Sequence, residues 1–229
     1  MNYKIISDEI IFRNFIDWLP ELLPNECFYG CLFSRKKYCP ELIHSSDKTQ
    51  LKRFTAIKST LYDKVKQLEC PIGSYRLKGR DVPQDSLVLY INPNPRDLIK
   101  ASFESIKSLT TCLQNKSIGF NPHQEVMSCI QRSKSRTIYF DVDIDESDND
   151  RLFESINQIK SYINPDCLTV LRTRGGVHCL VDVSKIKEQY KRTWHKNIIS
   201  VNNVDQTSDQ LLPAAGCIQG GFVPYFFQI

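Results

Sequence analysis

The feature that most constrains the fold of this chain is the stretch Thr-Ile-Tyr-Phe-Asp-Val-Asp-Ile-Asp at residues 137–145. Its β-branched and aromatic residues favour a β-strand. Because side chains on a strand alternate between two faces, Asp141, Asp143 and Asp145 are expected on one face, together with Tyr139. The residues between them are then expected to point into a core.

Three carboxylates on one face of a strand repel one another unless a cation lies among them. Neighbouring same-face positions are about 6.5–7 Å apart, which suits carboxylates that converge on one divalent ion or on a pair of ions about 3.5–4 Å apart. Mg²⁺ and Mn²⁺ prefer oxygen ligands, so the strand predicts a metal site for phosphate chemistry. The alternative is an acidic strand end that runs into a solvated turn at residues 146–150, because D-x-D is short and common.

Composition narrows the class of protein. The 229 residues are enough for one large or two small domains, and 41% hydrophobic with 24% charged residues is ordinary for a globular protein. A net charge of +4 is small, so an anionic partner must be argued from local clusters. We see neither a signal peptide nor a membrane-spanning run, and therefore expect an intracellular protein with no membrane partner.

The nine cysteines are an odd number, which in an intracellular protein indicates reduced thiols. Cys27, Cys31, Cys39 and His44 could be read as zinc ligands. Their spacing matches no standard finger, so buried free thiols are the expected state and zinc is not expected.

The first third of the chain predicts a helix within residues 3–23, a strand at 26–34 and a second helix at 47–68. The strand runs into Arg35, Lys36, Lys37 and Tyr38, a basic and aromatic cluster. One interpretation is a solvated loop. The other is contact with a nucleic-acid backbone, with Tyr38 available to stack on a base.

Further elements follow from hydrophobic spacing. Strands are expected at residues 86–91, 167–172 and 177–183, a hairpin arm at 75–80, and helices at 98–113, 124–130, 150–163 and 184–200. From residue 137 onward the order strand–helix–strand–strand–helix predicts an α+β fold with a split βαβ sheet, of the ferredoxin-like or RNA-recognition-motif-like type. Fold alone assigns no function.

The turn between two of these strands carries candidate ligand contacts. Arg172 and Arg174 precede Gly175 and Gly176, and His178 follows on the outgoing strand. Glycines let backbone amides approach a ligand, and Arg174 and His178 could then face phosphates. The alternatives are solvated arginines on a plain hairpin turn and a core histidine bonded to the backbone.

A further carboxylate could complete an acidic triad with Asp141 and Asp143. Asp205 follows an apolar residue and is the first candidate, while Asp209 and Asp182 compete with it.

Here the sequence resembles the catalytic core of the archaeo-eukaryotic primase superfamily, in particular the primase-polymerases of phages and plasmids. Residues 140–143 resemble the family's apolar-D-x-D/E strand, residues 176–178 its small-x-His motif, and residues 204–205 its later apolar-Asp. Residues 213–222 resemble the glycine-containing stretch that follows the third acid, but have no basic residue there. The resemblance covers residues 86–229.

The resemblance implies template-directed nucleotidyl transfer with two Mg²⁺ or Mn²⁺ ions, carried out by a DNA primase or primase-polymerase of a mobile element or virus. The implied metal ligands and catalytic residues are Asp141, Asp143 and Asp205; the implied contacts to the triphosphate are His178, Arg174, Gly176 and Arg172. Gly176 stands where the family often has serine, so it offers only its backbone amide.

The implied architecture is a primase-like core at residues 86–229 with an N-terminal α/β portion at residues 1–85 packed on it, together one compact catalytic unit. The implied partners are a single-stranded DNA template, nucleoside triphosphates and, optionally, a replicative helicase acting in trans. Two alternatives stay open: a non-catalytic single-stranded nucleic-acid-binding replication protein, and another two-metal nucleotidyl or phosphodiester enzyme.

Overall fold

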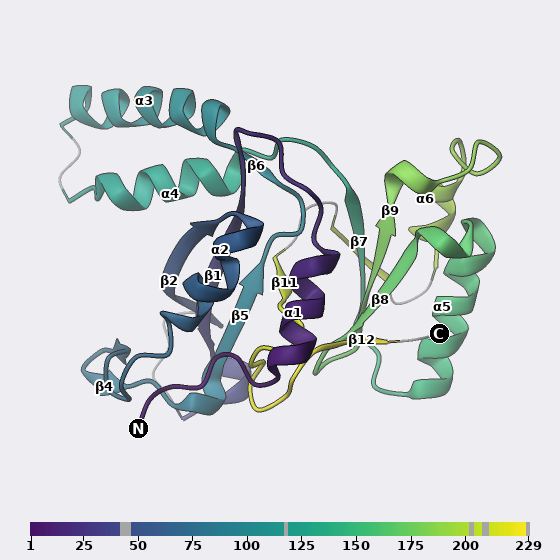
Figure 1. Ribbon diagram of the computed structural model, residues 1–229, viewed down its shortest axis with the longest axis horizontal. Helices are drawn as coiled ribbons and strands as arrows, with labels where there is room; N and C mark the ends of the chain where they lie inside the picture. The colour runs from purple at the N-terminus through teal and green to yellow at the C-terminus, as the bar shows by residue number, and fades with distance from the viewer. Residues whose placement is uncertain (42–46, 117–118, 202–203, 208–210, 228–229) are drawn as a thin grey trace.

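The computed structural model describes residues 1–41, 47–116, 119–201, 204–207 and 211–227, and of residues 205–207 the backbone alone. The fold is α+β, with two antiparallel five-stranded sheets in two lobes that lie side by side (Figure 1). A short hairpin of β3 (Arg76–Leu77) and β4 (Arg80–Asp81) stands apart from both sheets. No helix among the described residues is long and apolar enough to cross a membrane.

The first sheet has the strand order β11-β5-β1-β2, and β6 pairs with the other end of β1. Its strands are β1 (Glu26–Arg35), β2 (Lys48–Ala56), β5 (Leu87–Ile91), β6 (Arg96–Asp97) and β11 (Leu212–Pro213). The helices α1 (Glu9–Trp18) and α2 (Lys58–Lys66) belong to this lobe. The sheet thus joins strands from both ends of the chain, including β5 and β11 from the portion predicted as the primase-like core.

The second sheet has the order β10-β7-β9-β8-β12. Its strands are β7 (Tyr139–Ile144), β8 (Leu168–Arg172), β9 (Val177–Asp182), β10 (Val204–Thr207) and β12 (Tyr225–Phe227), and its helices are α5 (Asn149–Tyr162) and α6 (Trp194–Ile198). Phe140, Val142 and Ile144 pack with α5 and α6 in one hydrophobic core. The alternation predicted for the acidic strand is therefore confirmed, and Asp141 and Asp143 lie on the face turned away from these helices.

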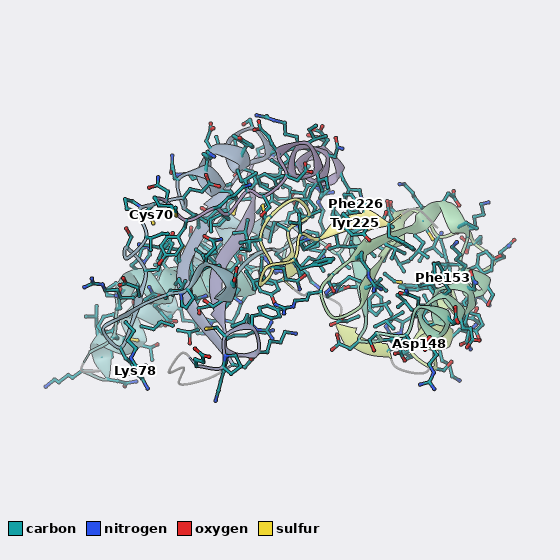
Figure 2. All side chains as sticks on the ribbon, turned by 90° about the horizontal axis from the view of Figure 1, so that it is seen from below. Cys70, Lys78, Asp148, Phe153, Tyr225 and Phe226 are labelled. Atoms are coloured by element: carbon teal, nitrogen blue, oxygen red, sulfur yellow. The ribbon has the colours of Figure 1, made fainter. Side chains whose placement is uncertain are left out.

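That opposite face meets the first lobe. Tyr139, Leu171 and Leu180 belong to the core that also contains α1, β1 and β5. The ring of Trp18 stacks on Tyr139 at a centroid distance of 4.4 Å and lies 5.1 Å from that of Phe226. Figure 2 shows Phe226 and its neighbour Tyr225 at the junction of the two lobes. This face of the second sheet is thus turned toward the first lobe.

Residues 92–97 also tie the lobes together. The Asn94 side chain accepts hydrogen bonds from the backbone N–H groups of Ile138 and Tyr139, at 2.8 and 2.9 Å, and donates one to the Tyr139 carbonyl at 2.9 Å. Asn92 and Arg96 are buried as well. This segment therefore fixes the start of β7.

The first of the two helices predicted in the N-terminal third is confirmed: α1, capped by Asp8, lies within residues 3–23 and ends before Pro20. The predicted helix at 47–68 is wrong in its first half, because Lys48–Ala56 forms β2 and pairs with β1 along its length. The spacing of apolar residues at 51 and 54 fits a helix, but pairing with a buried neighbouring strand outweighs local spacing.

The helix predicted at 184–200 is also wrong over most of its length. A 3₁₀ turn occupies Val183–Lys185 and α6 covers only Trp194–Ile198. Asp182 caps the turn by accepting from the Ser184 N–H, and Asn164 accepts from the Lys187 N–H. These side-chain bonds satisfy the backbone in a non-helical conformation.

The remaining long helices form a hairpin that projects from the first lobe (Figure 1). They are α3 (Leu98–Gln114) and α4 (Pro122–Arg132), and the second is longer than the helix predicted at 124–130.

Candidate functional site

A polar pocket of about 160 Å³ lies where the two lobes meet. Its lining comes from both sheets and from the glycine turn between β8 and β9: Arg35, Lys37, Lys48, Tyr90, Asp143, Asp145, Thr173, Gly175, His178, Leu211 and Pro213. One wall is therefore acidic and belongs to β7, and another is basic and belongs to the first lobe. Residues predicted from separate motifs meet in this one pocket.

The acidic wall is organised by His178. Its Nδ1 lies 3.0 and 3.1 Å from the two carboxylate oxygens of Asp141, and its Nε2 lies 3.7 Å from Asp143 Oδ1. Strand pairing explains the grouping, because Asp143 is directly opposite His178 in the β7–β9 ladder and opposite residues share a face. Asp141 and His178 are buried, and of the three residues His178 and Asp143 line the pocket.

Competing effects act on the protonation of His178. Burial by itself lowers the pKa of the imidazole, but the charge of Asp141, the hydrogen bond to Asp141 and the charges of Asp143 and Asp145 together raise it above its ordinary value. A protonated His178 offsets the repulsion between the two carboxylates.

The turn before β9 fits closely against the exit of β7. A Cβ atom on Gly176 would lie 1.9 Å from the carbonyl oxygen of Ile144, so only glycine fits at this approach. Gly176 accepts a hydrogen bond from the Thr173 N–H at 3.0 Å. Gly175 lies at the pocket, and a Cβ there would meet Asp145 Oδ1 at 3.1 Å. Gly176 is thus explained by strand packing, whereas Gly175 meets only the side chain of Asp145.

The basic wall is held in place by an ion pair and hydrogen bonds of Arg35. Arg35, buried at the end of β1, donates from Nε and Nη2 to Asp47 Oδ2 at 2.9 and 2.6 Å, and from Nη1 to the Tyr90 hydroxyl at 2.6 Å. Burial raises the pKa of Tyr90 to about 12. Burial, followed by the charge of Arg35, lowers the pKa of Lys48, whereas Asp143 acts in the opposite direction.

The other predicted basic residues lie around Tyr38. The Arg174 guanidinium lies 4.6 Å from the centroid of the Tyr38 ring and donates to the Gly220 carbonyl. Lys37 Nζ lies 5.3 Å from the same centroid and also lines the pocket, while Lys36 is exposed beside it. Arg174 thus links the glycine turn to the first lobe at the edge of the pocket.

Arg172 lies elsewhere. In the ladders it shares a rung with Val177 and Ile144, which belong to the core under α5. It is therefore placed on the opposite face of the sheet from His178.

The structure separates the candidates for the third carboxylate. Asp205 lies directly opposite Asp143 in the β10–β7 ladder, although its side chain is outside the described residues. Asp182 lies at the other end of β9, opposite Tyr139, where it accepts from Ser184 and pairs with Lys185 at 3.2 Å. Asp209 lies outside the described residues.

A wider pocket of about 550 Å³ shares Lys48, Tyr90 and Leu211 with the first. Its other lining residues are Phe33, Asn92, Arg96, Gln131 and Arg132, none of which was predicted as a site residue. The Asn-Pro-Asn-Pro-Arg run at residues 92–96 was a usable signal, since alternating asparagines and prolines between apolar elements indicate a specific backbone conformation.

Among the described side chains, no three His, Cys, Asp or Glu residues form a group that could hold a metal ion. Asp141 and Asp143 nevertheless supply two adjacent carboxylates of the oxygen type that Mg²⁺ and Mn²⁺ prefer, and position 205 adjoins them. Of the residues considered for zinc, Cys31 is buried against Gln50, whose Nε2 lies 3.0 Å from its sulfur, and His44 is outside the described residues.

Comparisons of this chain with models of protein families, with curated proteins and with solved structures find no match.

Proposed function

We propose that this protein is a template-directed nucleotidyltransferase of the primase-polymerase type. The observation that carries the proposal is the pocket in which the carboxylate of Asp143 faces the cations of Arg35, Lys37 and Lys48. A nucleoside triphosphate with divalent metal needs this combination, because its metal prefers carboxylates and its phosphates prefer cations.

The arrangement of the second sheet supports the same proposal. Its order β10-β7-β9-β8, with α5 and α6 on one face, corresponds to the split βαβ arrangement that polymerase palms share. The acidic residues lie on the face without helices, and Asp143 and Asp145 line a pocket together with residues of the first lobe. The carboxylates on this face of the sheet would repel phosphate groups unless a metal ion were bound between them. This disfavours a purely non-catalytic nucleic-acid-binding module.

Asp141, Asp143 and Asp205 are the residues that would hold the metal ions. When bound, two such ions activate an attacking 3′-hydroxyl and stabilise the transition state and the pyrophosphate leaving group. Position 205 is preferred to Asp182 because it lies opposite Asp143.

The chain's own side chains would then orient the nucleotide. His178, fixed through Nδ1 by Asp141, is a donor for a phosphate oxygen through Nε2. Lys37 and Lys48 would attract the triphosphate, with Arg35 positioning this wall through Asp47 and Tyr90. The wider pocket, with Phe33 and Tyr90 beside basic residues, would accommodate single-stranded template, since aromatic rings stack on bases and cations attract phosphates.

The test is synthesis of a phosphodiester product from labelled nucleoside triphosphates on a single-stranded DNA template, with Mg²⁺ or Mn²⁺. Asp143→Asn should abolish synthesis, and Asp150→Asn, an exposed carboxylate on α5, should leave it unchanged. The proposal fails if wild-type protein makes no product with either metal and Asp141→Ala binds nucleotide as wild type does. A cyclic product or template cleavage would instead indicate another two-metal enzyme.

A further inference from the structure

The outer face of α3 carries a row of exposed apolar side chains. Ile99, Phe103, Ile106 and Leu113 are 50%, 70%, 65% and 67% exposed. Their spacings of four, three and seven residues place them on one face over about 21 Å of helix. We call these four residues the α3 seam. Contiguous exposed apolar patches mark interaction sites more often than isolated ones do.

The seam is not the face by which α3 packs on its own protein. Ala101 and Ser105, on the opposite side of the helix, are the buried residues of α3. On the same side Ser108 donates a hydrogen bond to Glu125 of α4 at 2.6 Å, and the hairpin projects away from the second lobe (Figure 1). The described chain therefore covers the side of α3 that carries Ala101 and Ser105 and leaves the seam exposed.

A groove of about 290 Å³ adjoins the seam. It is lined by Leu98, Ala101, Ser102, Ser105 and Ile106 of α3 and by Val126 and Ile130 of α4. Ile106 belongs to both the seam and the groove, so the two form one continuous surface. Small residues in the groove leave room for the large side chains of another helix.

Charge decides what kind of helix fits. Lys100 and Lys107 are seven residues apart and flank the seam on the side away from the groove. Glu104 lies farther around the helix from the seam than these two lysines do. In a two-fold pairing of antiparallel α3 helices the same flank would meet itself, so the lysines would face lysines, which is unfavourable. Carboxylates on a different helix would pair with them.

We propose that the α3 seam and its groove bind an amphipathic helix of a partner protein, with an apolar stripe and acidic flanking residues. Recognition follows the helix-in-groove mode, in which side chains at i, i+3, i+4 and i+7 anchor the helix. Phe103, the most exposed large residue of the seam, is the central anchor. This site is separate from the pocket between the lobes and is independent of its chemistry.

The probe is a fluorescent synthetic helix of about three heptads with leucine at the apolar positions and glutamate at the flanks; its control carries lysine at the flanks. By fluorescence anisotropy with the full chain, the acidic peptide should bind about 10-fold or more tightly than the basic one. Phe103→Glu should weaken binding of the acidic peptide by about 10-fold or more. Ile10 of α1 is 74% exposed, so Ile10→Glu is the matched control and should leave binding of the acidic peptide unchanged. Replacing Lys100 and Lys107 by glutamate should reverse the preference.

The proposal is overturned if the acidic peptide does not bind, if Phe103→Glu and Ile10→Glu bind it equally, or if the basic peptide binds as tightly. A dimer seen by light scattering and abolished by Phe103→Glu would assign the seam to a second copy and also overturn it. So would binding to vesicles of anionic phospholipid without binding to the peptide.

Discussion

Replacing Gly176 by alanine should disturb the site through one atom. The added Cβ would lie 1.9 Å from the carbonyl oxygen of Ile144, 3.0 Å from its carbonyl carbon and 3.1 Å from the Glu146 nitrogen. The neighbouring atoms belong to the backbone of the β7 exit, so no side-chain rotation relieves the contact. The Ile144 oxygen must retreat by about 1.1 Å to reach even 3.0 Å.

Such a retreat opens the last rung of the β7–β9 ladder, where Ile144 is paired with Val177. Overpacking of a buried site costs about 1–3 kcal/mol, and one weakened backbone hydrogen bond costs about 0.5–1.5 kcal/mol. We therefore expect Gly176→Ala to lower the free energy of unfolding by about 1.5–4.5 kcal/mol. The neighbouring rung is Asp143 with His178, so any activity should fall as well.

The adjacent glycine is the matched control. A Cβ on Gly175 would meet Asp145 Oδ1 at 3.1 Å, the far end of an exposed side chain that can move. Gly175→Ala should thus change stability by less than about 1 kcal/mol. Urea unfolding followed by circular dichroism measures both variants. The reasoning is refuted if the two substitutions lower the free energy of unfolding by the same amount, or if Gly176→Ala is as stable as wild type.

Three further outcomes are expected. Asp141→Asn should lower the pKa of His178, as followed by NMR titration, because the carboxylate raises it. The stability that this pair provides is complete below the ordinary value of 6.5 and is lost as the pH rises through the raised pKa. Urea unfolding should therefore show a cost of about 3 kcal/mol for Asp141→Asn below pH 6.5, and this cost should shrink as the pH rises. Burial raises the pKa of Cys31 to about 12, so mass spectrometry should find this thiol unmodified by iodoacetamide while the half-buried Cys39 reacts. Trp18→Ala should cost about 2–4 kcal/mol and expose the junction of the lobes to limited proteolysis, because it removes the ring stacked on Tyr139.

The three central strands of the second sheet, β7, β8 and β9, were predictable because their sequence patterns are local. The acidic strand alternates apolar and polar residues, and both faces lie as the alternation predicts: Phe140 with the helices, Tyr139 toward the first lobe. The helix after it has a regular apolar stripe and an Asp148 cap. Strand pairing then brings His178 beside Asp141, which no local pattern specifies but the predicted sheet allows.

The first lobe was less predictable because its contacts join distant segments. Lys48 lies in the segment that was predicted to be a helix; as part of β2 it comes next to the end of β1 and reaches the pocket. Tyr90 was recognised as a strand residue, but its hydrogen bond to Arg35 depends on the β1–β5 register. These are pairings between residues far apart in the chain, and their partners cannot be read from spacing.

The glycine turn shows that a motif suggestive of ligand binding can also have a structural explanation. The run Arg174-Gly175-Gly176 suggests a phosphate loop, yet Gly176 is required by the approach of two strands and Arg174 by its contact with Tyr38. Both contacts hold the turn beside Asp143, so they position the acidic wall against the basic one even without touching a ligand. In the proposed nucleotide site this motif would therefore fix the distance between the two walls. Gly175, where an added Cβ would meet only the side chain of Asp145, lines the pocket and would offer its backbone to a ligand.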